Sequence, residues 1–304
     1  MHTLLLAAIA PMLWGTTYWV TQTFMPADTP LWTATLRALP IGLLLASLAR
    51  RPSWLWVGRS LLSGGLSVGL FFALLFIATY RLPGGVAATL GATLPLMAIL
   101  VVWLVQKQKP QGLQLIASVA AVPGVGLLVL SGQAALDWIG VLAALASCLV
   151  LALGTLLTKR WGKPQGTPLL VFTGWQLTAG GLVLLLLAWV FEGHPPALSE
   201  KNLLGSLWLG LINTGLAYVI WFRQMPKLNL VQLAFLGLGS PLTAVILGQT
   251  LAGEAFTPWQ WLGVAVVLGA MLVSQLGSKL GFGKKWRANR AAPLQAPASQ
   301  CVSD

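Results

Sequence analysis

The sequence has few charged residues for its length. Asp, Glu, Lys and Arg make up only 8% of the 304 residues, whereas 57% are hydrophobic and the mean hydropathy is +0.82. An average soluble domain carries roughly 25% charged residues, so this chain has too few charges to form a polar shell around an apolar core. Lipid must be the solvent for most of the chain, and the sequence predicts an integral membrane protein.

Residues that commonly carry catalysis or bind metals are also scarce. The chain has two histidines and two cysteines, and only Cys148 lies within a long apolar run, without a histidine beside it. A nucleophile with its base, or a set of metal ligands, cannot be assembled from these residues. The sequence contains no phosphate-binding loop, which argues against direct use of ATP. The sequence therefore predicts no enzymatic activity, no cofactor and no metal site.

Long apolar runs are what the chain has in abundance. A membrane-spanning helix takes about 20 apolar residues, and ten such runs follow one another with short connections. They lie near residues 3–24, 30–49, 60–80, 84–105, 111–131, 135–158, 167–191, 203–222, 228–250 and 258–277. The first run is expected to remain as a helix, because no Lys or Arg precedes it and Pro11 directly follows the small residues that a signal peptidase would need.

The cations sort to one side of these ten runs. If the N-terminus is cytoplasmic, fifteen of the eighteen Lys and Arg residues fall on the cytoplasmic side, two fall outside, and Arg37 lies within a run. Five of the six acids fall on the outer side. This is the positive-inside pattern, so it accounts for the net charge of +12 without a nucleic-acid partner. It predicts a bacterial inner-membrane protein with both termini in the cytoplasm.

The two halves of the chain resemble each other. The stretch DTPLWTATLRALPIGLLLASLA can be aligned with GTPLLVFTGWQLTAGGLVLLLL, and LGATLPLMAIL with LGLGSPLTAVIL. Residues 1–134 and 135–281 are therefore predicted as two five-helix repeats, with residues 282–304 as a basic, disordered cytoplasmic tail. Because five is odd, the second repeat must enter the membrane from the opposite side. The predicted fold is an all-α bundle of ten transmembrane helices in two inverted repeats, an arrangement typical of transporters. Similar composition of hydrophobic helices is the alternative explanation.

Several motifs resemble those of one family. They are LWGTTY, LRALP, YRLPGGVAATLGATLPL, GLINTGLAYVIWFR and SPLTAVILGQTLAGE, in this order. The combination resembles the EamA family of the drug/metabolite transporter superfamily, and within it the PecM-like branch. The family often has Gly-Glu after the fourth helix of each repeat; Gly253 and Glu254 match this pattern, whereas VQKQKP replaces it in the first half. The resemblance implies a ten-helix bundle and export of small molecules, without specifying the substrate.

Glycine and proline interrupt two runs at corresponding positions of the two halves. The interruptions are Gly91, Thr93 and Pro95 in the first half, and Gly239, Ser240 and Pro241 in the second. A proline removes a helical hydrogen bond and frees a carbonyl, which in a membrane must face protein or a wet cavity. Paired interruptions point to a substrate site. A packing kink is the alternative.

Polar and aromatic residues at similar depth complete the candidate site. They are Trp14 and Thr17 in the first run, Trp175 and Gln176 in the seventh, and Asn213 and Tyr218 in the eighth. As an alternative to a role in the site, Thr17 can bond to its own helix, and Trp14 and Trp175 can belong to the core. The two buried amides need partners in either case.

Arg37 is the most unusual residue of the set. It lies roughly 10 Å below the outer end of its helix, where an arginine costs a few kcal/mol or more. No acid or histidine lies well inside any run to pair with it. Arg37 can snorkel to the interface, bond to freed carbonyls and hold two helices together, or bind an anionic group of a substrate.

These features favour a secondary transporter that exports small metabolites by alternating access; amino-acid-like, pigment-precursor and drug-like solutes fit equally. A channel or a non-transporting membrane scaffold is the alternative. Proton coupling commonly uses an acid or histidine inside the membrane, so only Glu254 or Asp28 could supply it here. The expected partners are the lipid bilayer and a small solute, and the sequence is compatible with a monomer or a homodimer.

Overall fold

The protein is helical throughout the part that the structure describes. This computed structural model describes residues 2–48, 52–107, 112–130, 137–224 and 236–273, and these residues contain no β-strand. The α-helices are α1 (His2–Phe24), α2 (Pro30–Ser47), α3 (Trp54–Gly64), α4 (Phe71–Arg81), α5 (Gly84–Gly91), α6 (Leu94–Gln106), α7 (Gly112–Leu130), α8 (Trp138–Trp161), α9 (Leu169–Phe191), α10 (Glu200–Leu207), α11 (Ala217–Gln224) and α13 (Gly239–Leu251). A last helix spans Pro258–Val273. The predicted all-α class is confirmed over these residues.

Six helical segments are long and apolar enough to cross a membrane. They are Thr3–Phe24, Trp54–Arg81, Gly84–Gln106, Trp138–Trp161, Leu169–Phe191 and Glu200–Trp221. These spans show a membrane protein, while the count of ten helices and their inverted relation remain predictions. The ninth predicted run is described from residue 236 and the tenth as far as residue 273, whereas the predicted tail, 282–304, lies outside the described residues.

Two of these spans contain π-helical stretches, η1 (Gly65–Leu70) between α3 and α4, and η2 (Trp208–Leu216) between α10 and α11. In η2 the hydroxyl of Thr214 donates to the carbonyl of Leu209, five residues earlier, at 3.0 Å. Such stretches are rare and are frequent at functional sites. They fall in the third and eighth predicted runs, which occupy corresponding positions in the two predicted repeats.

Two other predicted helices are interrupted near the glycine and proline residues that predict a break. α5 ends at Gly91 and α6 begins at Leu94, with Pro95 in its first turn. In the second half, a turn at Leu238 precedes α13, which carries Pro241 in its first turn. The predicted interruptions are therefore present as breaks in both helices.

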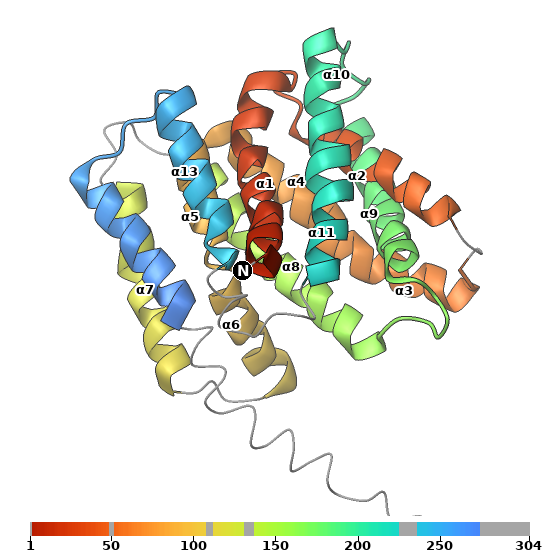
Figure 1. The fold of residues 1–304 in the computed structure, drawn as a ribbon, viewed down its shortest axis with the longest axis horizontal. Coiled ribbons are helices and arrows are strands. Elements are labelled where there is room, and N and C mark those ends of the chain that lie inside the picture. The colour runs from red at the N-terminus through yellow and green to blue at the C-terminus, as the bar shows by residue number, and fades with distance from the viewer. Residues whose placement is uncertain (1, 49–51, 108–111, 131–136, 225–235, 274–304) are drawn as a thin grey trace, which may run out of the picture.

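Small residues let the helices of the bundle approach closely, as is common in membrane proteins. α2 packs along α9, α1 along α13 and α11, and α8 along α4 and α6 (Figure 1). A Cβ on Gly42 of α2 would lie 2.5 Å from the backbone nitrogen of Thr178 on α9. A Cβ on Gly15 of α1 would lie 2.4 Å from the carbonyl oxygen of Ser240 on α13.

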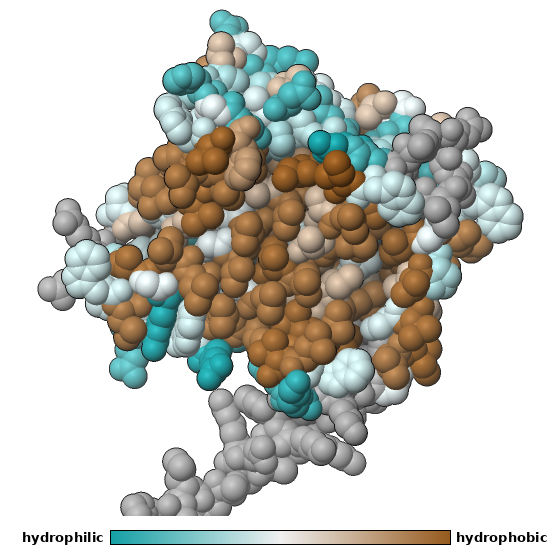
Figure 2. Space-filling view, turned by 180° about the vertical axis from the view of Figure 1, so that it is seen from behind, coloured by the Kyte–Doolittle hydropathy of each residue, from teal (hydrophilic) through white to brown (hydrophobic). Residues whose placement is uncertain are grey.

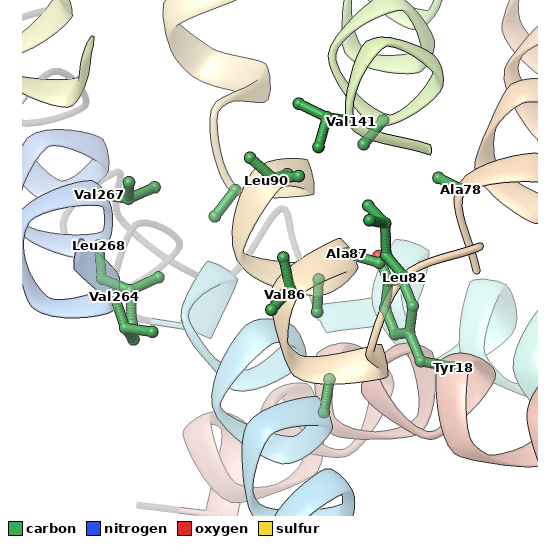
Figure 3. Close-up of a cluster of buried hydrophobic side chains, with 14 of the residues drawn as sticks. Tyr18, Ala78, Leu82, Val86, Ala87, Leu90, Val141, Val264, Val267 and Leu268 are labelled. Carbon is green, nitrogen blue, oxygen red and sulfur yellow. The ribbon is translucent and has the colours of Figure 1, made fainter. Parts of the chain in front are cut away.

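One apolar core surrounds the short helix α5. Figure 3 shows Val86, Ala87 and Leu90 of α5 among side chains from α1, the end of α4, α8 and the last helix. Leu90 and Val86 have no exposed surface. This packing fixes α5, and with it the position of the break that follows.

The outer surface of the bundle is apolar. Figure 2 shows a continuous apolar face, with hydrophilic residues gathered mainly at one end. Large exposed side chains include Leu43 and Leu44 of α2, Ile116 of α7, and Leu182 and Leu186 of α9. Soluble monomers rarely expose apolar patches larger than a few hundred Å², so this surface fits a lipid environment.

The contact between α9 and η1 gives a test of the helix packing. A Cβ on Gly180 would lie 2.5 Å from Cβ of Val68 and 2.6 Å from the carbonyl oxygen of Gly64, so the backbone must move. We expect Gly180→Ala to destabilise the protein by about 1–3 kcal/mol, measured by thermal unfolding in detergent. Gly58→Ala on α3 is the matched control, because nothing lies within 4 Å of a Cβ there. Equal melting temperatures for the two variants would contradict this packing.

Candidate substrate cavity

The two helix breaks and the π-helical stretch η1 border one central cavity of about 420 Å³. Residues of α1, α2, η1, α4, α5, α6, α8, α11, α13 and the last helix line it. Seven of the predicted site residues are among them: Trp14, Thr17, Arg37, Pro95, Tyr218, Ser240 and Pro241. Residues that are far apart in the sequence, from both predicted repeats, therefore meet around one space.

Arg37 is buried inside the bundle, where only 4% of its surface is exposed. Its Nε donates to the hydroxyl of Thr214 at 3.2 Å, and its NH1 donates to the hydroxyl of Thr17 at 3.3 Å. The guanidinium carbon lies 4.5 Å from the ring centre of Phe72 and 5.9 Å from that of Phe76. Burial excludes the snorkelling interpretation. The contacts hold the guanidinium at the cavity wall through hydroxyls and aromatic rings.

Asn213 supports this wall without lining the cavity. It is fully buried in η2, and its amide donates to the hydroxyl of Thr17 at 3.0 Å. Its backbone carbonyl accepts a hydrogen bond from the indole nitrogen of Trp14 at 2.9 Å. One residue of the π-helical stretch thus positions two lining residues on α1, and Thr17 in turn contacts Arg37.

Three other predicted residues lie away from the cavity. Trp175 packs on Phe172 near the end of α3, and Gln176 accepts from the hydroxyl of Ser63 at 3.2 Å. Both lie on the face of α9 that packs against α2, α3 and η1. Thr93 faces a separate apolar groove between α6, α7 and α8. Its hydroxyl donates to the carbonyl of Leu90 at 2.7 Å.

The structure also brings residues to the cavity that sequence reasoning missed. They are chiefly aromatic or small: Tyr18, Phe71, Phe72, Ser147 and Cys148. Tyr18 belongs to the LWGTTY motif, which also contains the predicted residues Trp14 and Thr17, so the motif itself was an available signal. No signal marked Ser147 and Cys148, because the sequence does not show which face of α8 turns inward.

The profile of the EamA-like transporter family matches residues 1–130 and 138–275 of the chain. The chain belongs to the EamA-like transporter family. It is 40% identical to Protein PecM of Dickeya dadantii (strain 3937), over 97% of each chain. It is 30% identical to the uncharacterised transporter YwfM of Bacillus subtilis (strain 168), over 88% of this chain and 92% of YwfM. The uncharacterised inner membrane transporter YedA of Escherichia coli (strain K12) is 28% identical, over 96% and 94% of the two chains.

A solved crystal structure shares the fold of this EamA chain. It matches 92% of this chain and 99% of its own, with a TM-score of 0.62 and 18% sequence identity. The description of the family and the names of YwfM and YedA are those of transporters rather than enzymes. With the apolar spans, they make the protein a membrane transporter, and the predicted resemblance is confirmed.

The glutamates of this EamA protein bind helix ends and not the cavity. Glu254, in the family's Gly-Glu motif, accepts from the backbone N–H groups of Gly84 and Gly85 at the start of α5. Glu192, at the end of α9, accepts from Leu31 and Trp32 at the start of α2, at 2.7 and 2.9 Å. Helix N-termini favour such negative charge. Partial burial raises the pKa of both carboxyl groups, although the backbone N–H groups oppose the shift.

Asp137 has the same function at the start of α8. Its carboxylate accepts from the backbone N–H groups of Ile139 at 2.7 Å and Gly140 at 3.3 Å. The ion pair with the Arg81 guanidinium lowers the pKa of Asp137. Asp28 lies in the exposed turn between α1 and α2. In the part of the chain that the structure describes, no carboxylate lines the cavity, so neither Glu254 nor Asp28 reaches it.

Glu254 predicts a pH dependence of stability. Because its pKa in the folded protein is raised above the ordinary value, the folded state holds this proton more tightly than the unfolded chain. Stability from this group is present at low pH and is lost as pH rises through the raised pKa. We expect the melting temperature of wild type minus that of Glu254→Gln to fall as the pH rises above the ordinary glutamate pKa of about 4.3. A difference that stays constant across this pH range would refute the assignment.

Proposed function

We propose that this EamA protein is a secondary transporter that exports small metabolites across the bacterial inner membrane by alternating access. The observation that carries the proposal is the central cavity, bordered by two broken helices and the π-helical stretch η1, with Arg37 at its wall. Its volume falls in the range of small-molecule sites. Non-helical backbone at membrane depth is expected where it lines such a cavity.

Reciprocal contacts support an arrangement as two inverted repeats. α1, the first helix of the first half, packs on α11 and α13 of the second half. α8, the first helix of the second half, packs on α4 and α6 of the first half. α2 and α9, which correspond in the alignment, pack on each other. An exchange of contacts of this kind is what a two-fold relation between the halves requires, and such pairs of repeats can rock around a central site.

The residues at the cavity also bear on how transport is driven. Among the described lining residues there is no carboxylate and no histidine that could take up a proton during each cycle. Exchange or facilitated diffusion fits these residues better than proton coupling. The same residues form no ring of charges of the kind that selects ions in a channel, which favours a carrier.

The cation distribution supports an orientation with both termini in the cytoplasm. Asp28 and Lys163 occupy exposed connections that this orientation assigns to opposite sides of the membrane. We expect a membrane-impermeant thiol reagent, added to intact cells, to label Asp28→Cys and to spare Lys163→Cys. The background for both variants is Cys148→Ser with Cys301→Ser. Labelling of Lys163→Cys alone would contradict this orientation and indicate the opposite one.

Flux into sealed proteoliposomes tests the transport proposal. A panel of radiolabelled aromatic solutes with anionic, zwitterionic and cationic head groups covers the possible charge types of a small metabolite. We expect protein-dependent uptake of at least one solute, with little change when a pH gradient is imposed. Uptake equal to that of protein-free liposomes for every solute would contradict the proposal and favour a scaffold. Uptake that follows the pH gradient would contradict the uncoupled mechanism.

A further inference from the structure

Building on the proposed transport function, we infer that the cavity around Arg37 selects an organic anion that carries no ammonium group. The substrate class is a monocarboxylate with a flat apolar body. Its carboxylate lies against the guanidinium of Arg37, and its apolar body lies between the aromatic side chains of the lining.

The charge of the cavity is unbalanced. Arg37 is the one charged residue among the described residues that line it. Asp137, Glu192 and Glu254 bind helix N-termini, while Asp28 and Glu200 are exposed. Residues 225–235 contain no acid in their sequence. A buried cation without a counter-charge is costly, so a bound anion would supply the charge that the protein lacks.

The guanidinium has donors left for such an anion. Arginine carries five N–H groups, and Arg37 gives one from Nε to Thr214 and one from NH1 to Thr17. Phe72 and Phe76 approach the guanidinium with their rings and accept no conventional hydrogen bond. Three N–H groups therefore have no partner among the described residues. A carboxylate can accept two parallel bonds from such a group.

An ammonium group would find no carboxylate among the described residues that line the cavity. The carbonyls of Leu90 and Gly91 at the α5–α6 break each already accept a hydrogen bond. The Leu90 carbonyl accepts from the backbone N–H of Thr93 at 3.1 Å and from its hydroxyl at 2.7 Å. The Gly91 carbonyl accepts from the thiol of Cys148 at 3.4 Å. Burial of an unpaired ammonium beside a cation is unfavourable, so zwitterions and amines should bind poorly.

The remaining lining suits a flat apolar body. Trp14, Tyr18, Phe71, Phe72 and Tyr218 contribute aromatic rings. Leu75, Leu151 and Met271 add aliphatic surface. Ring contacts with a planar ligand add to the area that it buries. The volume of about 420 Å³ accommodates a compact solute of this kind.

Three phenyl compounds that differ in their head group test the inference: 3-phenylpropanoate, phenylalanine and 2-phenylethylamine. Binding is measured as the rise in melting temperature of the full-length protein in detergent at pH 7. We expect 3-phenylpropanoate to raise it by roughly 5 °C at saturation, and the other two compounds by less than a quarter of that shift. Equal shifts for the three compounds, a larger shift for phenylalanine or the amine, or no shift at all would overturn the inference.

Two arginine variants show whether binding occurs at Arg37. Arg37→Gln should lose the shift, whereas Arg59→Gln should keep it. Arg59 also lies over aromatic rings, Trp56 and Trp161, but outside the cavity. If Arg37→Gln does not fold, Arg37→Lys replaces it, with at least a fivefold weaker dose response expected. A shift retained in a folded Arg37→Gln, or an unchanged dose response in Arg37→Lys, would overturn the inference.

The binding assay and the flux assay test the two proposals separately. Anion binding without any flux in proteoliposomes would contradict the transport proposal and leave the selectivity intact. Protein-dependent flux without a preference for the anion in the binding assay would overturn the selectivity and leave the transport proposal intact.

Discussion

Replacement of Arg37 by glutamine is expected to lower transport by about 10- to 100-fold while membrane abundance stays near normal. A hydrogen bond to a charged group contributes about 1.5–3 kcal/mol, and each 1.4 kcal/mol corresponds to a tenfold change in affinity. Glutamine is shorter and uncharged but keeps an amide donor for the hydroxyl of Thr17 or Thr214, so the wall of the cavity retains part of its support. The measurement is initial uptake into proteoliposomes, normalised to the protein incorporated.

Arg37→Lys separates a substrate contact from a purely structural role. Lysine keeps the charge but loses the planar fork, so a substrate contact predicts weaker apparent affinity with normal abundance. If Arg37 only ties α2 to η2 and α1, both variants should lose thermal stability, and the surviving protein should transport with ordinary affinity. Arg59→Gln is the control and should transport like wild type. A stable Arg37→Gln protein with unchanged affinity and rate would remove Arg37 from the site.

Replacement of both prolines at the helix breaks should lower transport about as much as replacement of Arg37. Pro95 and Pro241 cannot donate to the carbonyl four residues earlier, and those residues, Gly91 and Gly237, both line the cavity. Alanine can donate, so each helix can continue through its break and change the backbone that the substrate contacts. We expect Pro95→Ala combined with Pro241→Ala to lower transport at least about tenfold, as for the loss of a directly contacting group, with near-normal insertion into the membrane.

Pro123→Ala is the matched control for the breaks. Pro123 lies inside α7, is exposed, and does not line the cavity. Its replacement should leave transport unchanged, because the added N–H can only complete an ordinary helix. If the double variant transports like wild type, the breaks are packing kinks and the site lies elsewhere.

The all-helical class and the ends of several helices could be predicted from composition and from the positions of proline and glycine. Lipid demands apolar runs of a set length, so helices such as α1, α2 and α9 begin and end close to the predicted residues. Pro95 and Pro241 marked the breaks because proline acts locally. The π-helical stretch η1 could not be predicted, since it packs closely on α8: a Cβ on Gly154 would lie 2.6 Å from the backbone nitrogen of Ser67.

The sequence predicted how deep the candidate residues lie in the membrane, but not in which direction their side chains point. The position of a residue along its helix sets its depth, which placed Trp175 and Gln176 level with the other candidates. Which face turns to the cavity depends on the rotation of the helix, and α9 turns these two residues towards α3 and η1 instead. Arg37 was predicted correctly as unusual because charge at that depth needs a specific environment. The aromatic rings of Phe72 and Phe76, which supply part of it, carried no signal in the sequence.

Counterflow in proteoliposomes tests most directly whether the cavity around Arg37 is the binding site of a carrier. Vesicles are loaded with a high concentration of an unlabelled solute that shows protein-dependent uptake, and a trace of the labelled solute is added outside. A site that opens alternately to the two sides predicts a transient accumulation of label above its equilibrium level, strongly reduced in Arg37→Gln and unchanged in Arg59→Gln. A simple approach to equilibrium without any overshoot in the wild-type protein would contradict the carrier and indicate a channel.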